Sequence, residues 1–394
     1  MIYTLKNPIK NFPWGSRTAI RDYFGIDNPN SEHQAELWMG AHPLASSSIQ
    51  YYDEDVLLCD VIAQNPEYWL GKQITTSSPA FPFLVKILAA EEPLSIQVHP
   101  SKPAAEIGFA AENEQGMPLD APYRNYKDAN HKPELVYALT PYLAMNGFRE
   151  YNQILANFDA LELPTLKALC QPFKKNPNPL TLANFFSAIL SLSGALKIQA
   201  INELLNSSNT IDKSHFLYEA SSLISRFYQL YPEDIGLFAP LFLNIIELQP
   251  GEAMFLCAET PHAYVRGLGI EVMANSDNVL RAGLTPKYID LKELVSNTKF
   301  EPIKYADLKF EGEFSCGREI FNVPVDDFSV DVFKNTKEFI EVLSPEVILC
   351  IEGKVCFSYG TNILEIEKGE SVIIPAYMMK YQIDCAGTAM RVYC

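Results

Sequence analysis

Residues able to bind a metal ion recur at three places in the first two thirds of the chain. Gln97 and His99 are two positions apart in the strand-like segment Leu-Ser-Ile-Gln-Val-His-Pro, so both side chains project from the same face. A carboxylate at Glu134 and an imidazole at His262 could complete a set of nitrogen and oxygen ligands. Such a set suits Zn²⁺ with one exchangeable position, although Fe²⁺ or Mn²⁺ would accept similar ligands.

Each of these residues also has a purely structural interpretation. A single histidine in a strand is often a hydrogen-bonded structural residue, and Gln97 alone would be a polar surface position. Residues 269–287 are more informative, because a strand bearing Glu271 leads into a polar loop that presents one arginine, Arg281. The alternative for this arginine is that it pairs with Asp277 and only fixes the loop.

The elements that would present these residues follow from the spacing of apolar side chains. Residues 1–100 predict strands and turns, with apolar strands over 81–90 and 94–99. Between 151 and 240 the apolar period becomes helical, with Gly194 as a stop for one helix and Pro232 after another. The apolar residues of these two helices are Leu182, Phe185, Phe186, Ile189 and Leu190, then Phe216, Ala220, Leu223, Phe227 and Leu230.

Short strands separated by turns return from residue 241 and predict a β-sandwich or jelly roll. Thr285 and Pro286 are typical of a helix N-cap and the first helical position after it. No histidine occurs after His262, so a second β unit would have no histidine-ligated metal. The C-terminal strands are expected over 347–351, 355–359, 364–366 and 371–374, with turns at Gly353, Gly360 and Gly369.

These patterns predict three structural units. Residues 1–150 together with 241–300 would form a catalytic β domain, and residues 151–240 a helical insert domain. Residues 301–394 would form a C-terminal β domain without metal ligands. A chain of 394 residues with 48% hydrophobic content is long enough for such a division.

Composition narrows the class of partner. The formal net charge of −17 argues against nucleic acid, which is held by clusters of lysine and arginine. No apolar run has the length of a membrane span, so we expect no membrane partner and a cytoplasmic protein, most simply a monomer. The eight cysteines form no CxxC pair and are expected to be reduced core residues. A small phosphorylated substrate would need a local group of cations to overcome the acidic field.

Four motifs, taken together, resemble the type I phosphomannose isomerases, members of the cupin superfamily. The resemblance extends from about residue 13 to residue 295, and the C-terminal 90 residues carry no specific motif of the family. The motifs are Leu-Ser-Ile-Gln-Val-His-Pro at 94–100, His-Lys-Pro-Glu-Leu at 131–135, Pro-His-Ala-Tyr at 261–264, and Asn-Ser-Asp-Asn-Val-Leu-Arg-Ala-Gly-Leu-Thr-Pro-Lys at 275–287.

This resemblance implies a mainly β fold of cupin-type jelly-roll sandwiches with an α-helical insert. It implies an aldose–ketose isomerase that interconverts mannose 6-phosphate and fructose 6-phosphate by proton transfer through a cis-enediol(ate). It also implies one Zn²⁺ per chain and an active-site arginine, Arg281. The implied zinc ligands are Gln97, His99, Glu134 and His262.

The remaining roles are candidate assignments. Glu271 is the first candidate for the base that moves the carbon-bound proton, because its strand follows His262 closely, with Lys132 and His131 as competitors. The other candidates for contact with the substrate are Ser95, Lys86, Lys287, His131 and Tyr264. Two other functions stay open, namely a metal-dependent cupin enzyme of different chemistry and a non-catalytic sugar-binding cupin.

Overall fold

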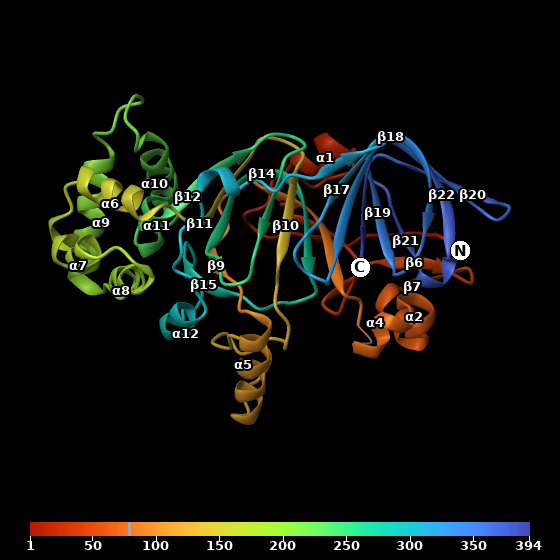
Figure 1. The fold of residues 1–394 in the computed structure, drawn as a ribbon, viewed down its shortest axis with the longest axis horizontal. Helices are drawn as coiled ribbons and strands as arrows, with labels where there is room; N and C mark the ends of the chain where they lie inside the picture. Colours follow the sequence, from red (N-terminus) through yellow and green to blue (C-terminus); the bar gives the residue numbers. More distant parts are fainter. Residues whose placement is uncertain (78–79) are drawn as a thin grey trace.

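Two large antiparallel sheets make up most of the strand structure, and the computed structural model describes residues 1–77 and 80–394. In Figure 1 a group of helices stands at one end, the first sheet occupies the middle and the C-terminal sheet lies at the other end. The mainly β fold with a helical insert, predicted from the sequence, is therefore confirmed.

The first sheet carries the candidate metal ligands. Its longest strand, β14, pairs with β11 and β9 near its beginning and with β10 and β8 near its end. Side chains alternate between the two faces of each strand, so Lys86 in β8 faces away from Val85 and Ile87. The ten strands are β2 (Ile9–Lys10), β3 (Glu36–Met39), β8 (Phe83–Ala90), β9 (Ile96–Val98), β10 (Glu134–Ala138), β11 (Tyr142–Phe148), β12 (Leu243–Leu248), β13 (Ala253–Leu256), β14 (His262–Ala274) and β15 (Leu280–Gly283).

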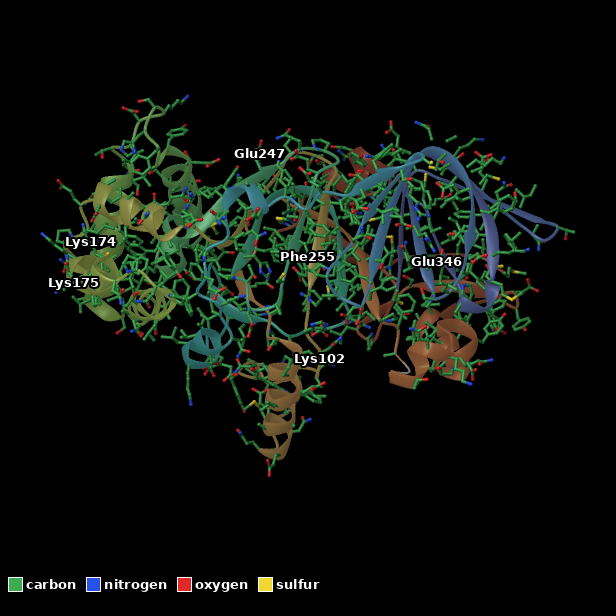
Figure 2. The ribbon with its side chains drawn as sticks, viewed as in Figure 1. Lys102, Lys174, Lys175, Glu247, Phe255 and Glu346 are labelled. Carbon is green, nitrogen blue, oxygen red and sulfur yellow. The ribbon has the colours of Figure 1, made fainter. Side chains whose placement is uncertain are left out.

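The second sheet is built from the C-terminal residues together with the N-terminal strand β1, which pairs with β21. One face packs against the first sheet, and the other encloses an apolar core of its own. Figure 2 shows Glu346 within these strands. They are β1 (Tyr3–Thr4), β16 (Glu313–Ser315), β17 (Arg318–Phe321), β18 (Ser329–Glu341), β19 (Glu346–Tyr359), β20 (Asn362–Glu367), β21 (Ser371–Ile374) and β22 (Lys380–Tyr393).

The predicted turn at Gly353 is wrong, because the residue lies inside the single long strand β19. Its φ is 73°, and the register with β22 shifts between Cys350 and Glu352. A Cβ atom at this position would be 2.0 Å from the Ala386 carbonyl oxygen. Gly353 therefore lies at a β-bulge, where the absence of a Cβ atom lets β19 and β22 approach each other closely. Strand β19 continues through this position.

Helices between the two halves of the first sheet form the insert. Gly194, expected as a helix stop, instead begins α9, while α8 ends at Leu190. Within the described residues no single helix is long and apolar enough to cross a membrane; α8 and α9 pass that test only as a pair bent by 107°. The insert helices are α6 (Tyr151–Ala160), α7 (Pro164–Lys175), α8 (Pro179–Leu190), α9 (Gly194–Ser208), α10 (Tyr218–Leu230) and α11 (Ala239–Phe242).

The remaining helices surround the sheets. The helix predicted to begin at Thr285 starts later, because Thr285 N donates to Asp234 Oδ2 and Asp290 is the actual N-cap of α12. The other helices are α1 (Ala19–Phe24), α2 (Leu58–Gln64), α3 (Pro66–Leu70), α4 (Lys72–Ser77), α5 (Lys102–Glu114) and α12 (Leu291–Ser296). Two short hairpins join β4 (Ala41–His42) to β5 (Ala45–Ser46) and β6 (Ser48–Tyr51) to β7 (Glu54–Leu57).

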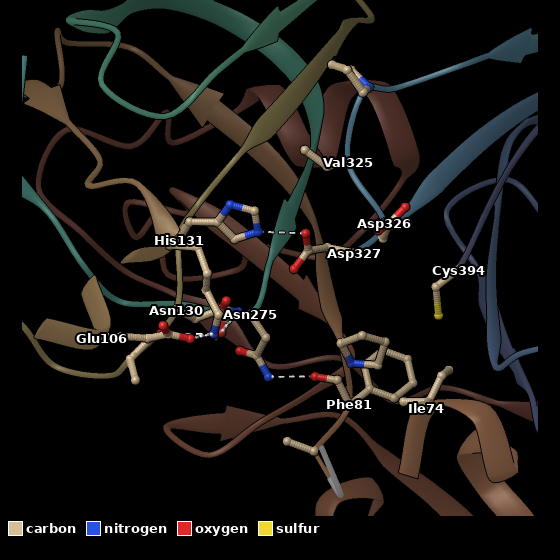
Figure 3. Close-up of a pocket in the computed structure, with 15 residues that line it drawn as sticks. Ile74, Phe81, Glu106, Asn130, His131, Asn275, Val325, Asp326, Asp327 and Cys394 are labelled. Carbon is tan, nitrogen blue, oxygen red and sulfur yellow. Dashed lines mark hydrogen bonds and ion pairs between the residues drawn. The ribbon is translucent and has the colours of Figure 1, made fainter. Parts of the chain in front are cut away.

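A shared core joins the two sheets. It includes Val85, Leu135 and Val272 from the first sheet and Phe328 and Val347 from the C-terminal residues. Beside this core lies a cavity of about 830 Å³, lined by segments of both halves (Figure 3). All eight cysteines are free, and three of them are buried.

Candidate metal centre

Strand register brings the predicted ligands together. Gln97 in β9 lies directly opposite His262 in β14 on one side and opposite Arg281 in β15 on the other. Residues directly opposite each other in an antiparallel pair present their side chains on the same face. His99 follows two positions after Gln97 and therefore returns to that face.

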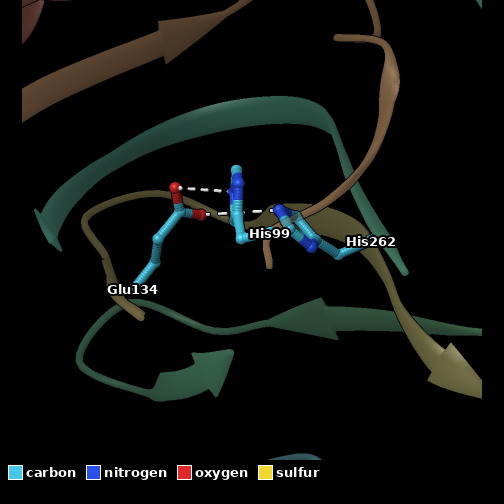
Figure 4. A group of neighbouring side chains, drawn as sticks. All are labelled: His99, Glu134 and His262. Atoms are coloured by element: carbon cyan, nitrogen blue, oxygen red, sulfur yellow. Dashed lines mark ion pairs between the residues drawn. The ribbon is translucent and has the colours of Figure 1, made fainter. Parts of the chain in front are cut away.

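Three buried side chains converge there. One ligand atom from each of His99, Glu134 and His262 lies within 4.8 Å of the others. Figure 4 shows the Glu134 carboxylate facing both imidazoles, with His99 Nε2 3.2 Å from Oε1 and His262 Nε2 3.5 Å from Oε2. Each of the three residues is at most 2% exposed.

Backbone carbonyls fix the tautomer of both histidines. His99 Nδ1 is 2.7 Å from the Asn278 oxygen, and His262 Nδ1 is 2.9 Å from the Thr260 oxygen. A carbonyl only accepts, so Nδ1 carries the proton and the Nε2 lone pair of a neutral ring points at the carboxylate. His99 Nε2 is buried without a hydrogen-bond partner. Lone pairs directed at a carboxylate in this way fit a bound divalent cation.

The electrostatic environment keeps His99 and Glu134 in the forms that bind metal. Burial, with Lys132 adding to it, lowers the pKa of His99 to about 4, so its ring is neutral. Burial opposes ionisation of Glu134, but Lys132 and His99 hold its pKa well below the usual range. Lys132 Nζ is 3.0 Å from Glu134 Oε1, and the Tyr264 hydroxyl donates to Oε2 at 2.6 Å.

A second row of polar residues lies on the same face of the sheet. Glu271 is opposite Lys86, which is opposite Trp38 on the next strand. Lys86 Nζ is 2.8 Å from Glu271 Oε2 and 3.9 Å from Glu36 Oε1, and the Trp38 indole donates to Glu36 at 2.6 Å. Burial raises the pKa of Glu271, and Lys86 opposes that rise. Glu36 and Trp38 were missed from the sequence, although they are two positions apart in a strand, as are Gln97 and His99.

Several cationic side chains interact with Arg281, which lies opposite Gln97 on the side away from His262. Burial lowers the pKa of Arg281. The pKa of Lys287 is lowered by burial and by Arg281, and that of Lys127 by burial, Arg124 and Arg281. Ser95 directly precedes β9, two positions before Gln97. Lys127 was not identified from the sequence.

Asp277 has a different partner from the one considered in the sequence. Its Oδ2 is 3.4 Å from His42 Nε2, and the His42 ring packs edge-on against Trp38. Among the described residues no ion pair joins Asp277 to Arg281. His42 was missed because it lies far from Asp277 in the sequence.

Two further predicted residues point to different places. Lys132 reaches Glu134, whereas the adjacent His131 faces the C-terminal sheet, where its Nε2 is 2.7 Å from Asp327 Oδ2. Both residues lie just before β10, and their side chains point to these different partners. The roles assigned to both residues stay predictions.

Comparison with known families finds three matches along the chain. The model described as "Phosphomannose isomerase type I, catalytic domain" matches residues 2–151. The helical insertion domain of the same family matches residues 162–243, and "Mannose-6-phosphate isomerase, cupin domain" matches residues 318–394.

Individual relatives agree over the whole length. The chain is 45% identical to the mannose-6-phosphate isomerase of Escherichia coli, over 99% of this chain and 98% of the relative. It is 32% identical to the human protein of that name, over 92% and 90%. A zinc-bound crystal structure of mannose 6-phosphate isomerase superimposes with a TM-score of 0.93 at 44% identity, covering 100% of this chain and 99% of that one. A variant of the Salmonella typhimurium phosphomannose isomerase gives a TM-score of 0.94 at 43% identity with the same coverage.

Proposed function

Because this chain belongs to the type I phosphomannose isomerase family, we propose that it interconverts D-mannose 6-phosphate and D-fructose 6-phosphate with one zinc ion per chain. The single observation that carries the proposal is the buried cluster of His99, Glu134 and His262, in which lone pairs face a carboxylate. This arrangement fits a zinc ion, and the full-length relatives carry the isomerase name.

Four residues would hold the zinc ion, namely Gln97, His99, Glu134 and His262. When bound, zinc supplies a Lewis acid that stabilises negative charge on the substrate oxygens at C1 and C2. The Tyr264 hydroxyl and the Lys132 ammonium each contact Glu134 and keep its carboxylate oriented. Carbonyl contacts at Nδ1 do the same for the two histidines.

We assign the proton transfer between C1 and C2 to Glu271. A general base has to be deprotonated and still have a pKa near the working pH. Burial raises the pKa of Glu271 in that direction, while the nearby Lys86 ammonium favours the charged carboxylate. A positioned base of this kind contributes about 10²–10⁴-fold. Lys132 is the alternative base, because its ammonium already lies beside the metal-facing carboxylate.

Arg281 and Lys287 are assigned to the anionic part of the substrate, with Lys127 as an addition from the structure. In a chain of net charge −17, these neighbouring cations give a phosphate group a local attraction against the acidic field of the chain as a whole. Ser95 would add a hydroxyl donor at the edge of the same region. Lys86 forms an ion pair with Glu271, the assigned base. This contact favours a role for Lys86 beside the reacting carbons of the substrate over a role in binding its phosphate.

The two other functions are less well supported. An oxygenase or decarboxylase of the cupin superfamily would use a similar metal site but would have no need of the cations around Arg281. A non-catalytic sugar-binding protein would have no need of a carboxylate and an ammonium buried together at Glu271 and Lys86.

We also propose the three-domain division described above, with the boundaries near residues 150, 240 and 300. A monomer is sufficient to form the proposed active site, because all the residues assigned to it lie in one chain. Eight free cysteines fit a reducing compartment such as the cytoplasm. Light scattering of the purified protein tests the oligomeric state.

The test of function is a coupled assay with mannose 6-phosphate, run together with elemental analysis. We expect about one zinc per chain, loss of turnover on chelation, and recovery on adding Zn²⁺. Addition of Fe²⁺ or Mn²⁺ to the metal-free protein tests the choice of ion, and unphosphorylated mannose tests the role of the cations. Full turnover by metal-free protein would contradict the proposal, and bound metal without turnover would favour a different cupin chemistry.

A further inference from the structure

The start of β10 lies between the metal centre and the C-terminal sheet. Lys132 and Glu134 face the metal centre, whereas His131 faces a segment of the C-terminal half. Figure 3 shows the His131 imidazole turned toward the Asp327 carboxylate at the edge of the cavity. The two side chains are 2.7 Å apart and only about one fifth exposed, at 21% and 18%.

Asp327 is held by a rigid support. It lies on the connection between β17 and β18, directly before Phe328, which is fully buried in the core shared by the two sheets. Phe321, at the other end of the connection, is 1% exposed in the same core. The carboxylate is therefore presented from a fixed position in the C-terminal half of the chain.

His131, by contrast, borders open space. It lines the cavity of about 830 Å³, so packing leaves room for its ring to move. The residues before it are tied by Lys102 Nζ, which donates to the Ala129 oxygen at 2.9 Å. The residue after Lys132 is tied by Ala274 N, which donates to the Pro133 oxygen at 3.2 Å. Between these anchors the Asn130 oxygen also accepts from Asn278 Nδ2 at 2.8 Å and from Ser276 Oγ at 3.2 Å. The contact with Asp327 is therefore the tether of the His131 side chain, directly before Lys132.

We infer that Asp327 is a positioning residue, which acts through His131 to hold Lys132 against Glu134 and so lets the C-terminal domain set the geometry of the active site. This inference rests on the proposed function insofar as Lys132 serves the isomerisation. Its structural part, the ordering of His131 and Lys132 by Asp327, does not depend on which reaction the site performs.

The experiment uses full-length, zinc-loaded protein with three substitutions. Asp327→Ala removes the acceptor, Asp327→Asn keeps an oxygen that can accept from His131, and Asp326→Ala is the matched control, an exposed neighbour lining the same cavity. Misplacing a catalytic group by about 1 Å costs up to about 100-fold, so we expect Asp327→Ala to lower kcat by about 10- to 100-fold. KM should change little, because Arg281 and Lys287 lie on another segment. Asp327→Asn should retain most of kcat, and Asp326→Ala should match the wild type.

Hydrogen exchange supplies a readout that does not depend on turnover. The backbone amides of residues 131 and 132 should exchange faster in Asp327→Ala than in Asp327→Asn, while thermal melting stays nearly constant. Normal kcat in Asp327→Ala would overturn the inference. So would a loss of activity that follows a lowered melting temperature and is not rescued by Asp327→Asn. If the wild type lacks isomerase activity, the proposed function fails, and unchanged exchange at residues 131 and 132 is then the separate result that would overturn the positioning role.

Discussion

Replacing Lys86 with methionine gives the sharpest test of Glu271 as the base. Lys86 Nζ is 2.8 Å from Glu271 Oε2, and the two side chains are 8% and 3% exposed. Methionine keeps an apolar stem of similar shape but removes the ammonium. Burial then raises the pKa of Glu271 without opposition from its partner.

The size of the shift follows from the distance. Two unit charges about 4 Å apart interact by about 4 kcal/mol at an effective dielectric constant of about 20, which corresponds to about 3 pKa units. Structural relaxation and water entry reduce this value, so we expect a rise of about 1–3 units. A base has to be ionised, so the acid limb of the kcat/KM profile should move to higher pH by that amount.

The measurement is kcat/KM against pH for zinc-loaded wild type and variant. Lys10→Met is the matched control, because the Lys10 ammonium lies over the same Trp38 ring, at 5.0 Å compared with 5.3 Å for Lys86. The control should keep the wild-type acid limb. If Lys86→Met also keeps that limb while its rate falls, Glu271 is not the titrating base, and Lys132 becomes the better candidate.

Three other substitutions test separate parts of the structure. Arg281→Ala should lower kcat/KM by about 10²–10³-fold with an unchanged melting temperature, and near-normal kcat/KM would contradict its assignment. Arg391→Met removes the cation that contacts the buried Glu346 through two nitrogens and leaves it the hydroxyl of Tyr381, so urea denaturation should show a loss of about 3–5 kcal/mol with zinc content unchanged. Gly353→Ala should lower the melting temperature far more than Gly360→Ala, because both glycines have positive φ but only the first lacks space for a Cβ atom.

The ligand positions could be predicted to the extent that they depend on local geometry. The spacing of Gln97 and His99 is a property of one strand, and alternation alone places them on the same face. Glu134 and His262 have no such local relation to them, and the resemblance to a family supplied them. The same local reasoning failed at Gly353, because a glycine within two long crossing strands has the same sequence pattern as a glycine in a turn.

Contacts between distant residues lay outside the reach of the sequence. Lys86 and Glu271 are 185 positions apart, and only the register of β8 with β14 places them opposite each other. Asp277 is four positions from Arg281, which made their pairing plausible, but β15 carries the arginine to Gln97 and leaves Asp277 beside His42.

The directions of the side chains along residues 131–135 also explain why the C-terminal sheet can matter without carrying a metal ligand. Lys132 and Glu134 face the metal centre, while His131 contacts Asp327 and Leu135 packs into the core shared with Phe328. One short segment therefore has its chemical groups on one face and its supports on the other. A displacement of the C-terminal sheet would reach Lys132 through Asp327 and His131, so a sheet without histidines can influence the reaction through the position of this segment.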